Sequence, residues 1–594
     1  MKSKLANTTQ RPGQRPNSRT GQAVSFASSP LLASKTPLWR SKLILVAFGI
    51  AFAGLGARAA YVQVIHQSFY QKQGEIRFAR TLDIPASRGR LLDRNDQIMA
   101  SNVPATSVWA IPEDINPSLA KDPEKLNSLA RLLGLRVPEL QKKLSEEDRS
   151  FVWLRRQLDG SIRADIEALK IEGLYTRTES RRQYPEGEAA MQITGMLNND
   201  GKGIEGIELA FNQELSGQNG SRRVIKDRMG RVVEDVGDRV APVDGHDVRL
   251  TIDNKIQFYA YQKLKEAVTE QRAKGGAVVI LDVQTNEVLA LANYDASSNK
   301  NGILRNRALA DSFEPGSVMK PLTIALALEK GLVTPRTTFQ TAPGYIMVTG
   351  AKITDSHAHG VLTVDQIIEK SSNVGTVKIA QQIPYKDMWE FYSALGLGQK
   401  PVLPYPGIVG GKLRAYKAWR PVEQATMSYG YGLSTSLFQL AQAYSVLASD
   451  GELVAPRIVQ SSTPAARQRV MSAVNARAVR HMLNLAAGPE GTAPKAQLEG
   501  YTVGGKTGTS HKQEGRGYAA KKYRSTFVGM SPIDAPRIVV AVSIDEPSAG
   551  KYFGGEVAAP IFSQTVGQTL RLLGVQPDRA VKPQIAVTAV EEST

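Results

Sequence analysis

The chain has 594 residues, 42% hydrophobic and 22% charged, a globular composition on a length that exceeds one ordinary domain. It contains no cysteine, which excludes disulfides, thiolate metal sites and thiol catalysis. The net charge of +18 could indicate nucleic-acid binding. The excess is partly local, because eight basic and no acidic residues fall within positions 1–42, and we interpret it as a topology signal and expect no nucleic-acid partner.

The first 64 residues predict a tail and a membrane anchor. Residues 1–42 offer little to bury, so we expect a disordered, basic, cytoplasmic tail. An apolar run from Leu43 to Ala57 continues past Arg58 to Val64, which is near the length of one transmembrane signal-anchor helix at 43–64. The alternative is a signal peptide cleaved at Ala57-Arg58-Ala59. The basic tail predicts that the rest of the chain lies outside the cytoplasm.

Residues 65–240 alternate strand-like and helical phrases without a catalytic cluster of their own, which predicts an elongated mixed α/β domain. Their charges gather in three phrases, Arg88–Asn95, Arg182–Pro185 and Gly203–Glu208. We interpret these charges as an ion-pair scaffold between this domain and the next. The boundary falls near 238–247, where Pro242 and Gly245 interrupt the pattern.

Residues 245–572 predict an α+β domain with a central antiparallel sheet and helices on both sides. The predicted elements are a strand at 248–253, a helix at 255–272, a hairpin of 276–283 and 287–292, and strands at 501–509, 525–529 and 537–544. The hairpin turns at Thr285-Asn286. The last residues, 573–594, predict a loose tail.

The phrase from Phe313 to Pro321 predicts the start of a helix. Pro321 fits only a first helical turn, which puts Ser317 at or next to the N-terminus. Lys320 lies on the same face three residues later, so a nucleophile has a candidate base beside it. That base must be neutral, which requires its pKa to fall by about three units from ~10.4. Burial and a second nearby cation could produce this shift.

A Ser-x-x-Lys match is weak alone, since Ser118 with Lys121 and Ser297 with Lys300 also fit it. Two further motifs distinguish Ser317. Ser371-Ser372-Asn373 follows a short helix that begins at a Thr363 and Gln366 capping box, and Lys506-Thr507-Gly508-Thr509 ends a strand. The three motifs in this order are typical of penicillin-binding proteins and class A β-lactamases.

With the apolar segment and the three charged phrases, these motifs resemble the class B penicillin-binding proteins, over nearly the whole chain to about Gln564. The phrases Tyr429–Gly432 and Tyr552–Gly555 resemble the division-specific members, which are peptidoglycan D,D-transpeptidases. Where such proteins usually have glycine, this chain has Asp96, which tolerates a left-handed turn better than most residues. Residues 65–240 then correspond to the family's periplasmic pedestal, or dimerisation-type, domain, and residues 245–572 to its transpeptidase (penicillin-binding) domain, the catalytic domain.

The resemblance implies the roles of eight residues. Ser317 is the acylated nucleophile, Lys320 its base, Ser371 a proton relay, and Lys506 the second cation. Substrate binding falls to Asn373, Thr507, Gly508 and Thr509. The N–H groups of Ser317 and Thr509 form the oxyanion hole. The strand adds a physical reason for the glycine, because a side chain at Gly508 would crowd the gap to the serine helix, and the open strand edge could pair with an extended substrate.

The resemblance also implies the partners and the location. Stem peptides of peptidoglycan are the substrate, β-lactams inhibit, and a membrane glycosyltransferase of the FtsW type and other division proteins bind at the septum. The protein would be a single-pass inner-membrane protein with a periplasmic catalytic domain and a possible carboxypeptidase side activity. We expect no cofactor and no metal, since His357 and His359 lack a third ligand. An elongation-type transpeptidase, a serine β-lactamase or β-lactam receptor, and a catalytically idle division scaffold remain alternatives.

Overall fold

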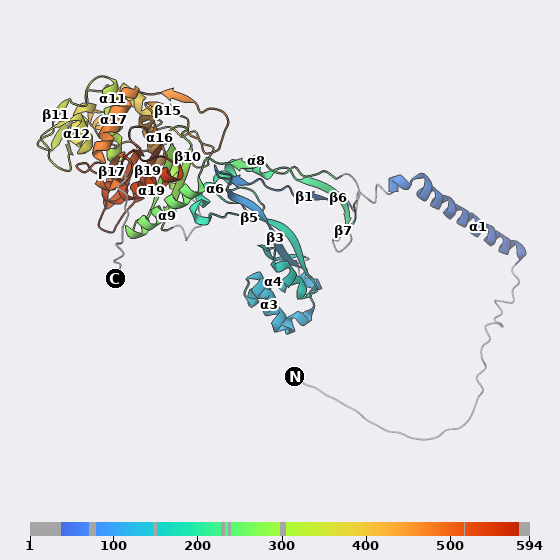
Figure 1. Ribbon diagram of the computed structural model, residues 1–594. Helices are drawn as coiled ribbons and strands as arrows, with labels where there is room; N and C mark the ends of the chain where they lie inside the picture. Colours follow the sequence, from blue (N-terminus) through green and yellow to red (C-terminus); the bar gives the residue numbers. More distant parts are fainter. Residues whose placement is uncertain are drawn as a thin grey trace, which may run out of the picture. The chain divides into compact units, whose positions relative to one another are not determined.

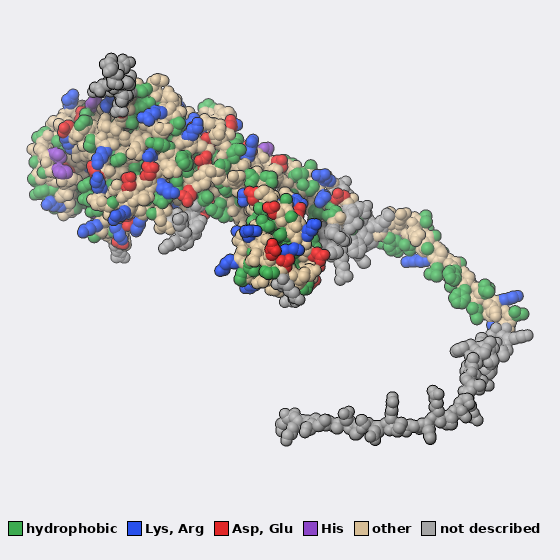
Figure 2. Space-filling view, turned by 60° about the horizontal axis from the view of Figure 1, so that its bottom comes forward, with side chains coloured by type: hydrophobic (Ala, Val, Ile, Leu, Met, Phe, Trp, Pro, Cys, Tyr) green, Lys and Arg blue, Asp and Glu red, His purple; other side chains and the backbone are tan. Residues whose placement is uncertain are grey.

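The computed structural model describes residues 37–70, 79–145, 151–226, 232–235, 239–297, 305–515 and 517–580. The tail predicted at 1–42 lies mostly outside the described residues. The predicted apolar helix is present and starts earlier, with α1 at Leu38–Ala60 and a π-helical turn at Tyr61–Ile65. Its 28 residues are long and apolar enough to cross a membrane, and hydrophobic side chains line it throughout (Figure 2).

Two sheets form outside the catalytic domain. A small sheet has the order β1-β6-β7, with β1 at Ala79–Ile84, β6 at Gly220–Lys226 and β7 at Val232–Asp235. The other centres on β3, Ile98–Ala110, which pairs with β2 (Leu91–Leu92), β4 (Val152–Asp159) and β5 (Leu174–Gln183). The helices α3 (Pro123–Leu133) and α4 (Val137–Leu144) pack on this sheet. They do so through Leu129, Leu133 and Leu140, which share one hydrophobic core with Val108 and Leu154 of the sheet.

The three charged phrases make two kinds of contact, one inside the pedestal and one to the catalytic domain. Arg88 and Arg182 both donate to Glu208, whose side chain is fully buried, so these three form an ion triad inside the pedestal. The bridges to the catalytic domain come from the first phrase, where Asn95 donates to Asp253 at 2.9 Å and Asp93 accepts from the backbone N–H of Asn254 at 3.1 Å. Arg94 also pairs with Glu287 at 3.5 Å. The predicted scaffold is therefore confirmed for the first phrase. The neighbouring residue 96 adopts the left-handed turn, with φ 62°.

The catalytic domain is built on a five-stranded antiparallel sheet of order β10-β9-β19-β18-β17 (Figure 1). The strands are β9 (Gly275–Asp282), β10 (Val288–Asp295), β17 (Gly504–Glu514), β18 (Gly517–Ser531) and β19 (Ile538–Asp545). One face packs on α11 (Lys320–Glu329), α16 (Leu437–Ala448) and α17 (Ala473–Ala486), the other on α9 (Asn254–Glu270) and α19 (Ala559–Leu572). The predicted α+β fold with helices on both faces is confirmed.

Successive side chains of β19 enter the hydrophobic cores on opposite faces of the sheet, so helices cover both faces. Val539 and Ala541 belong to the core under α11, α16 and α17, whereas Val540 and Val542 belong to the core under α9 and α19. All four are fully buried, which is why the strand reads as one continuous apolar run. Strand β17 ends the sheet, so its outer edge is open, as the sequence predicts.

The structure corrects two sequence expectations at the ends of this domain. The strand expected at 248–253 is only β8, Val248–Arg249, and it pairs in parallel with β2 of the pedestal sheet, so it joins the two domains. The first part of the expected loose tail is held in place, because Val575 accepts from Tyr501 at 2.7 Å and Asp578 from the N–H of Thr502 at 2.7 Å. Residues 581–594 lie outside the described part.

Candidate active site

The Ser317 segment is a single 3-10 turn, Gly316–Met319, that runs directly into α11. Pro321 occupies the first turn of α11, as predicted. Behind this turn, the N–H of Gly316 donates to the carbonyl oxygen of Gly430 at 3.0 Å. A Cβ built on Gly430 would lie 2.1 Å from the Gly316 carbonyl oxygen, so only glycine allows this contact. Ser317 is thus held at the surface of a rigidly packed segment, partly exposed.

Lys320 is completely buried, which is unusual for a lysine. Its Nζ donates to the carbonyl oxygen of Ser371 and, at 3.0 Å, to Ser371 Oγ. Burial lowers the pKa of Lys320 from 10.5 to about 7, while the negative charge of Asp355 opposes the shift. A large share of Lys320 is therefore neutral near pH 7, as a general base requires. None of its hydrogen bonds within the described chain goes to Ser317 Oγ, and such contacts often form only with bound substrate.

Lys506 is also completely buried and donates to Thr507 Oγ1 at 3.2 Å and weakly to Thr492 Oγ1 at 3.5 Å. Burial and the positive charge of Lys320 lower its pKa well below 10.5. The sequence analysis assigned part of the Lys320 shift to Lys506 as a second cation. In the structure, burial lowers the pKa of Lys320, and burial together with the nearby charge of Lys320 lowers the pKa of Lys506.

The loop that carries Ser371 is strained and tightly held. Ser371 adopts φ 60°, a left-handed conformation that is rare outside glycine and is often found at functional sites. One oxygen of Asp355 accepts from Ser372 Oγ at 2.7 Å, and the other accepts from the backbone N–H groups of Asn373 and Val374. This carboxylate therefore caps α13, Asn373–Ala380, and fixes the loop. No motif in the sequence marks Asp355.

The predicted capping box is confirmed, and Asn373 lies just beyond the helix that it begins. Thr363 and Gln366 form the predicted capping box at the start of α12, Val364–Glu369. Asn373 donates through Nδ2 to the carbonyl oxygen of Thr354 at 2.6 Å. That bond orients the amide of this partly exposed residue.

Strand β17 lies directly against the serine segment. A Cβ on Gly508 would lie 2.8 Å from the Pro315 carbonyl oxygen and 3.1 Å from Val318, so the predicted crowding at this glycine is confirmed. Thr507 is nearly buried, and its Oγ1 forms a hydrogen bond with Thr492 Oγ1 at 3.0 Å. Thr492 precedes the strand in a loop without sequence signal. Beyond it, Thr509 Oγ1 accepts from the N–H of Gly554 at 3.0 Å, which docks the Tyr552–Gly555 phrase onto β17.

The Tyr429–Gly432 phrase is a turn of packed aromatic rings. The rings of Tyr429 and Tyr431 lie 5.7 Å apart, and the N–H of Gly432 donates to Glu314 at 2.8 Å, three residues before Ser317. The phrase is therefore a structural turn behind the serine segment.

The Ser118 and Ser297 matches to Ser-x-x-Lys are not brought to this site. Ser118 is exposed in a short 3-10 turn of the pedestal, Pro117–Lys121. Ser297 is exposed and donates to Asp295 at 2.7 Å, and Lys300 lies outside the described residues.

Two family models match the chain. The penicillin-binding protein transpeptidase domain matches residues 276–567, and the penicillin-binding protein dimerisation domain matches residues 83–250. The probable peptidoglycan D,D-transpeptidase PenA of Neisseria gonorrhoeae is 38% identical over 550 residues, which cover 91% of this chain and 94% of PenA. The peptidoglycan D,D-transpeptidase FtsI of Escherichia coli K12 is 35% identical over 549 residues, 91% of this chain and 93% of FtsI.

The chain belongs to the class B penicillin-binding proteins.

Solved structures agree with this family. The transpeptidase domain of Burkholderia pseudomallei penicillin-binding protein 3, in its apo form, is 52% identical and covers 56% of this chain and 98% of that chain, with a TM-score of 0.53. Mycobacterium tuberculosis penicillin-binding protein 3 in complex with aztreonam is 28% identical and covers 84% and 98% of the two chains, with a TM-score of 0.65.

Proposed function

We propose that this class B penicillin-binding protein is a division-type peptidoglycan D,D-transpeptidase. It would cross-link stem peptides of the septal wall through an acyl-enzyme on Ser317, and β-lactams would inhibit it by acylating the same residue. The observation that carries the proposal is the pair of fully buried lysines, Lys320 and Lys506, beside Ser317 and Ser371. The names of PenA and FtsI and the aztreonam complex of a solved relative support it.

In the acylation step, Ser317 Oγ attacks the carbonyl carbon of the penultimate D-alanine and passes its proton to neutral Lys320. The oxyanion that develops is stabilised by the N–H groups of Ser317 and Thr509. The C–N bond then breaks, and the leaving amine of D-alanine takes a proton from Lys320 through Ser371 Oγ, which accepts from Lys320 Nζ at 3.0 Å. The products are an ester on Ser317 and free D-alanine.

In the second step, the amine of a neighbouring stem peptide attacks the ester carbon, and Lys320 takes the amine proton. The ester C–O bond breaks and Ser317 Oγ recovers a proton, so the enzyme is regenerated and a new amide bond joins the two strands. Attack by water instead of an amine would give the carboxypeptidase side activity.

The C-terminal carboxylate of the donor peptide would bind at Lys506 and Thr507. These two groups lie together, with Thr492 completing the cluster. A carboxylate here would favour the ammonium form of Lys506, because an opposite charge nearby raises a lysine pKa. The restored cation would then favour the neutral form of Lys320. Substrate binding would thereby prepare the base.

The apolar helix and the basic N-terminal segment support a single-pass inner-membrane protein with a cytoplasmic N-terminus and a periplasmic catalytic domain. Glycan strands would come from a membrane glycosyltransferase of the FtsW type. Septal location follows from the resemblance of the Tyr429–Gly432 and Tyr552–Gly555 phrases to division-type enzymes.

The reaction type is tested with the full-length protein in detergent, a donor peptide ending in D-Ala-D-Ala and an excess of an acceptor amine. We expect release of D-alanine together with a donor–acceptor amide product. Rapid hydrolysis of benzylpenicillin without cross-linked product would favour the β-lactamase alternative. Normal septation by a Ser317→Ala chain in cells would favour the idle scaffold.

The pH dependence of acylation follows from the lowered pKa of Lys320. Only neutral Lys320 accepts the proton, so the rate should rise with pH and level off above the pKa of about 7. We expect a single midpoint near neutrality when the acylation rate with a penicillin is measured from about pH 5.5 to about pH 9. A rate that still rises steeply above about pH 9 would show a lysine with its ordinary pKa and would contradict this assignment.

A further inference from the structure

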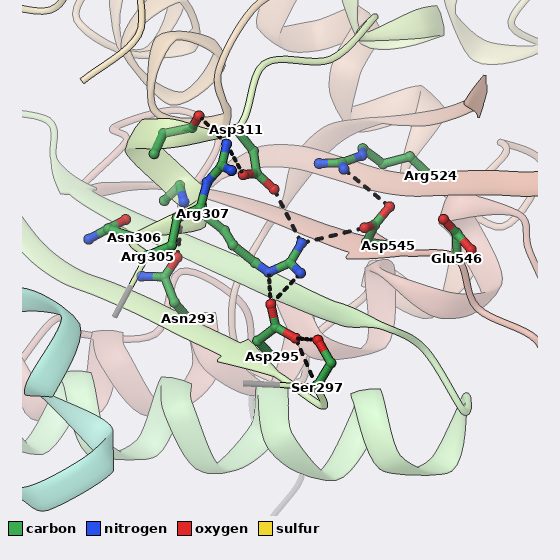
Figure 3. A network of polar contacts seen from close by, with 12 residues as sticks. Asn293, Asp295, Ser297, Arg305, Asn306, Arg307, Asp311, Arg524, Asp545 and Glu546 are labelled. Carbon is green, nitrogen blue, oxygen red and sulfur yellow. Dashed lines mark hydrogen bonds and ion pairs between the residues drawn. The ribbon is translucent and has the colours of Figure 1, made fainter. Parts of the chain in front are cut away.

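A buried carboxylate lies at the far end of the sheet's central strand, outside the motifs. Asp545 is the last residue of β19 and is 5% exposed. It accepts from Arg524 Nη2 at 3.1 Å and more weakly from Arg307 Nη1 at 3.4 Å (Figure 3). It also accepts from Lys512 Nζ at 2.9 Å. Although burial opposes ionisation, Arg524, Lys512 and Arg307 together hold the pKa of Asp545 below its ordinary value.

The narrow gap between β17 and the Ser317 segment is named the Ser317 cleft. Each of the three cations lies on β17, on the neighbouring strand β18 or at the start of the segment that leads to Ser317. Lys512 is on β17, three residues beyond Thr509. Arg524 is on β18, next to Ser525, which pairs with Thr509 across the ladder. Arg307 opens the short helix α10, Arg307–Ala310, at the start of the segment that leads to Ser317.

Arg524 connects Asp545 to the serine segment itself. Its guanidinium lies over the ring of Phe313, 4.5 Å from the centroid, four residues before Ser317. The backbone of Phe313 is fixed from the other side by its N–H, which donates to the carbonyl oxygen of Thr435 at 3.0 Å. Arg307 adds a second connection through Asp295 and Asp311, which tie α10 to the end of β10. One carboxylate thus joins both sides of the cleft.

The two sides of the cleft are in close contact near Gly508. The gap between β17 and the serine segment is so narrow that a single methyl group on Gly508 would overlap the Pro315 carbonyl oxygen. Without the charge of Asp545, Arg524 would lose the carboxylate that holds its guanidinium over Phe313. Lys512 would keep its pair with Glu546 at 2.7 Å, and Arg307 would keep its pairs with Asp295 and Asp311. The connection between the two sides would be lost, so β17 and the serine segment could shift apart. A displacement of about 1 Å between reacting groups can cost on the order of 100-fold in rate.

We propose that Asp545 is a positioning residue that sets the width of the cleft between β17 and the Ser317 segment through Lys512, Arg524 and Arg307. It touches neither substrate nor reacting atoms. The proposal rests on the proposed acyl transfer at Ser317, and it assigns to this ionic cluster a role in rate beyond stability.

The chain offers a matched control. Asp282 is the last residue of β9, is 1% exposed, and pairs with Arg537. In the ladder, Asp282 pairs with Ile538 at one end of β19, whereas Asp545 lies at the other end. Asp282→Asn therefore removes an equally buried carboxylate from the same sheet without touching the cleft.

The test measures acylation of the full-length protein by a fluorescent penicillin, with non-covalent affinity and the acylation rate constant separated, for wild type, Asp545→Asn and Asp282→Asn. We expect Asp545→Asn to lower the acylation rate constant by about 10- to 100-fold, with the pH midpoint unchanged because the lysine pair is untouched. Asp282→Asn should acylate within about twofold of wild type at a similar loss in melting temperature. The same result for both variants would reduce Asp545 to a structural role.

Two further variants identify the route. Lys512→Gln removes the pairs that β17 makes with Asp545 and Glu546. The side chain is partly exposed, so the variant should fold, and it should slow acylation several-fold even if Asp545→Asn does not fold. When Arg524→Gln is combined with Asp545→Asn, the acylation rate constant should fall little further, since both substitutions act through one cluster. Additive losses, or normal acylation by Lys512→Gln, would overturn the proposal. The same assay also distinguishes a failure of the proposed function, because in that case the wild-type protein itself would form no adduct on Ser317.

Discussion

Replacing Lys320 by methionine is expected to slow acylation by on the order of 1,000-fold or more, because general-base catalysis contributes about 100- to 10,000-fold and the Ser371 relay is lost with it. Lys320 is fully buried, with a pKa lowered to about 7, and its hydrogen bonds go to Ser371. Methionine has a similar length and no charge to bury, so the fold should keep or gain stability. Rapid-quench measurement of penicillin acylation gives the rate.

Lys330→Met is the control for this variant. Lys330 follows the same helix, but its side chain is 45% exposed and pairs with Asp387 at the surface. Its acylation rate should stay within about twofold of wild type, as is usual for distant surface sites. If Lys320→Met acylated within about tenfold of wild type, another group would have to be the base.

Replacing Gly508 by alanine is expected to slow acylation by about 100-fold. The added Cβ would lie 2.8 Å from the Pro315 carbonyl oxygen and 3.1 Å from Val318, and the first of these is backbone that cannot rotate away. Strand β17 must therefore move from the serine segment, which displaces the Thr509 N–H from the proposed oxyanion hole and costs about 1–3 kcal/mol of stability. Acylation kinetics and thermal unfolding measure the two effects.

Gly517→Ala is the matched control, because Gly517 opens β18 of the same hairpin and a Cβ there meets nothing within 4 Å. It should acylate like wild type. Normal acylation by Gly508→Ala would show that the two sides of the cleft can separate without loss and would contradict the account of a narrow cleft.

Local patterns predict much of this site. Pro321 locates the helix start after Ser317, the Thr363 and Gln366 box locates α12, and alternation along β17 places Gly508 toward the serine segment. Each of these depends on residues close in sequence, where sterics and hydrogen-bond periodicity act directly.

Contacts between distant segments are not predictable in this way. Asp355 caps the Ser371 loop from a preceding strand end, Thr492 meets Thr507 from a loop, and Asp545 gathers cations from three elements. The pairing of β8 with the pedestal sheet has the same origin, because register between remote strands is set by tertiary packing. The lowered pKa values of Lys320 and Lys506 have burial as their main cause, which spacing does not reveal.

The most direct test of the central claim is intact-mass and peptide-mapping analysis of the full-length protein after incubation with benzylpenicillin. The account predicts one stable adduct, on the peptide that carries Ser317, and none in Ser317→Ala. An adduct on another serine, or unchanged protein with unchanged drug, would contradict the assignment of Ser317 as the nucleophile. Unmodified protein with hydrolysed drug would contradict the long-lived acyl-enzyme on which inhibition depends.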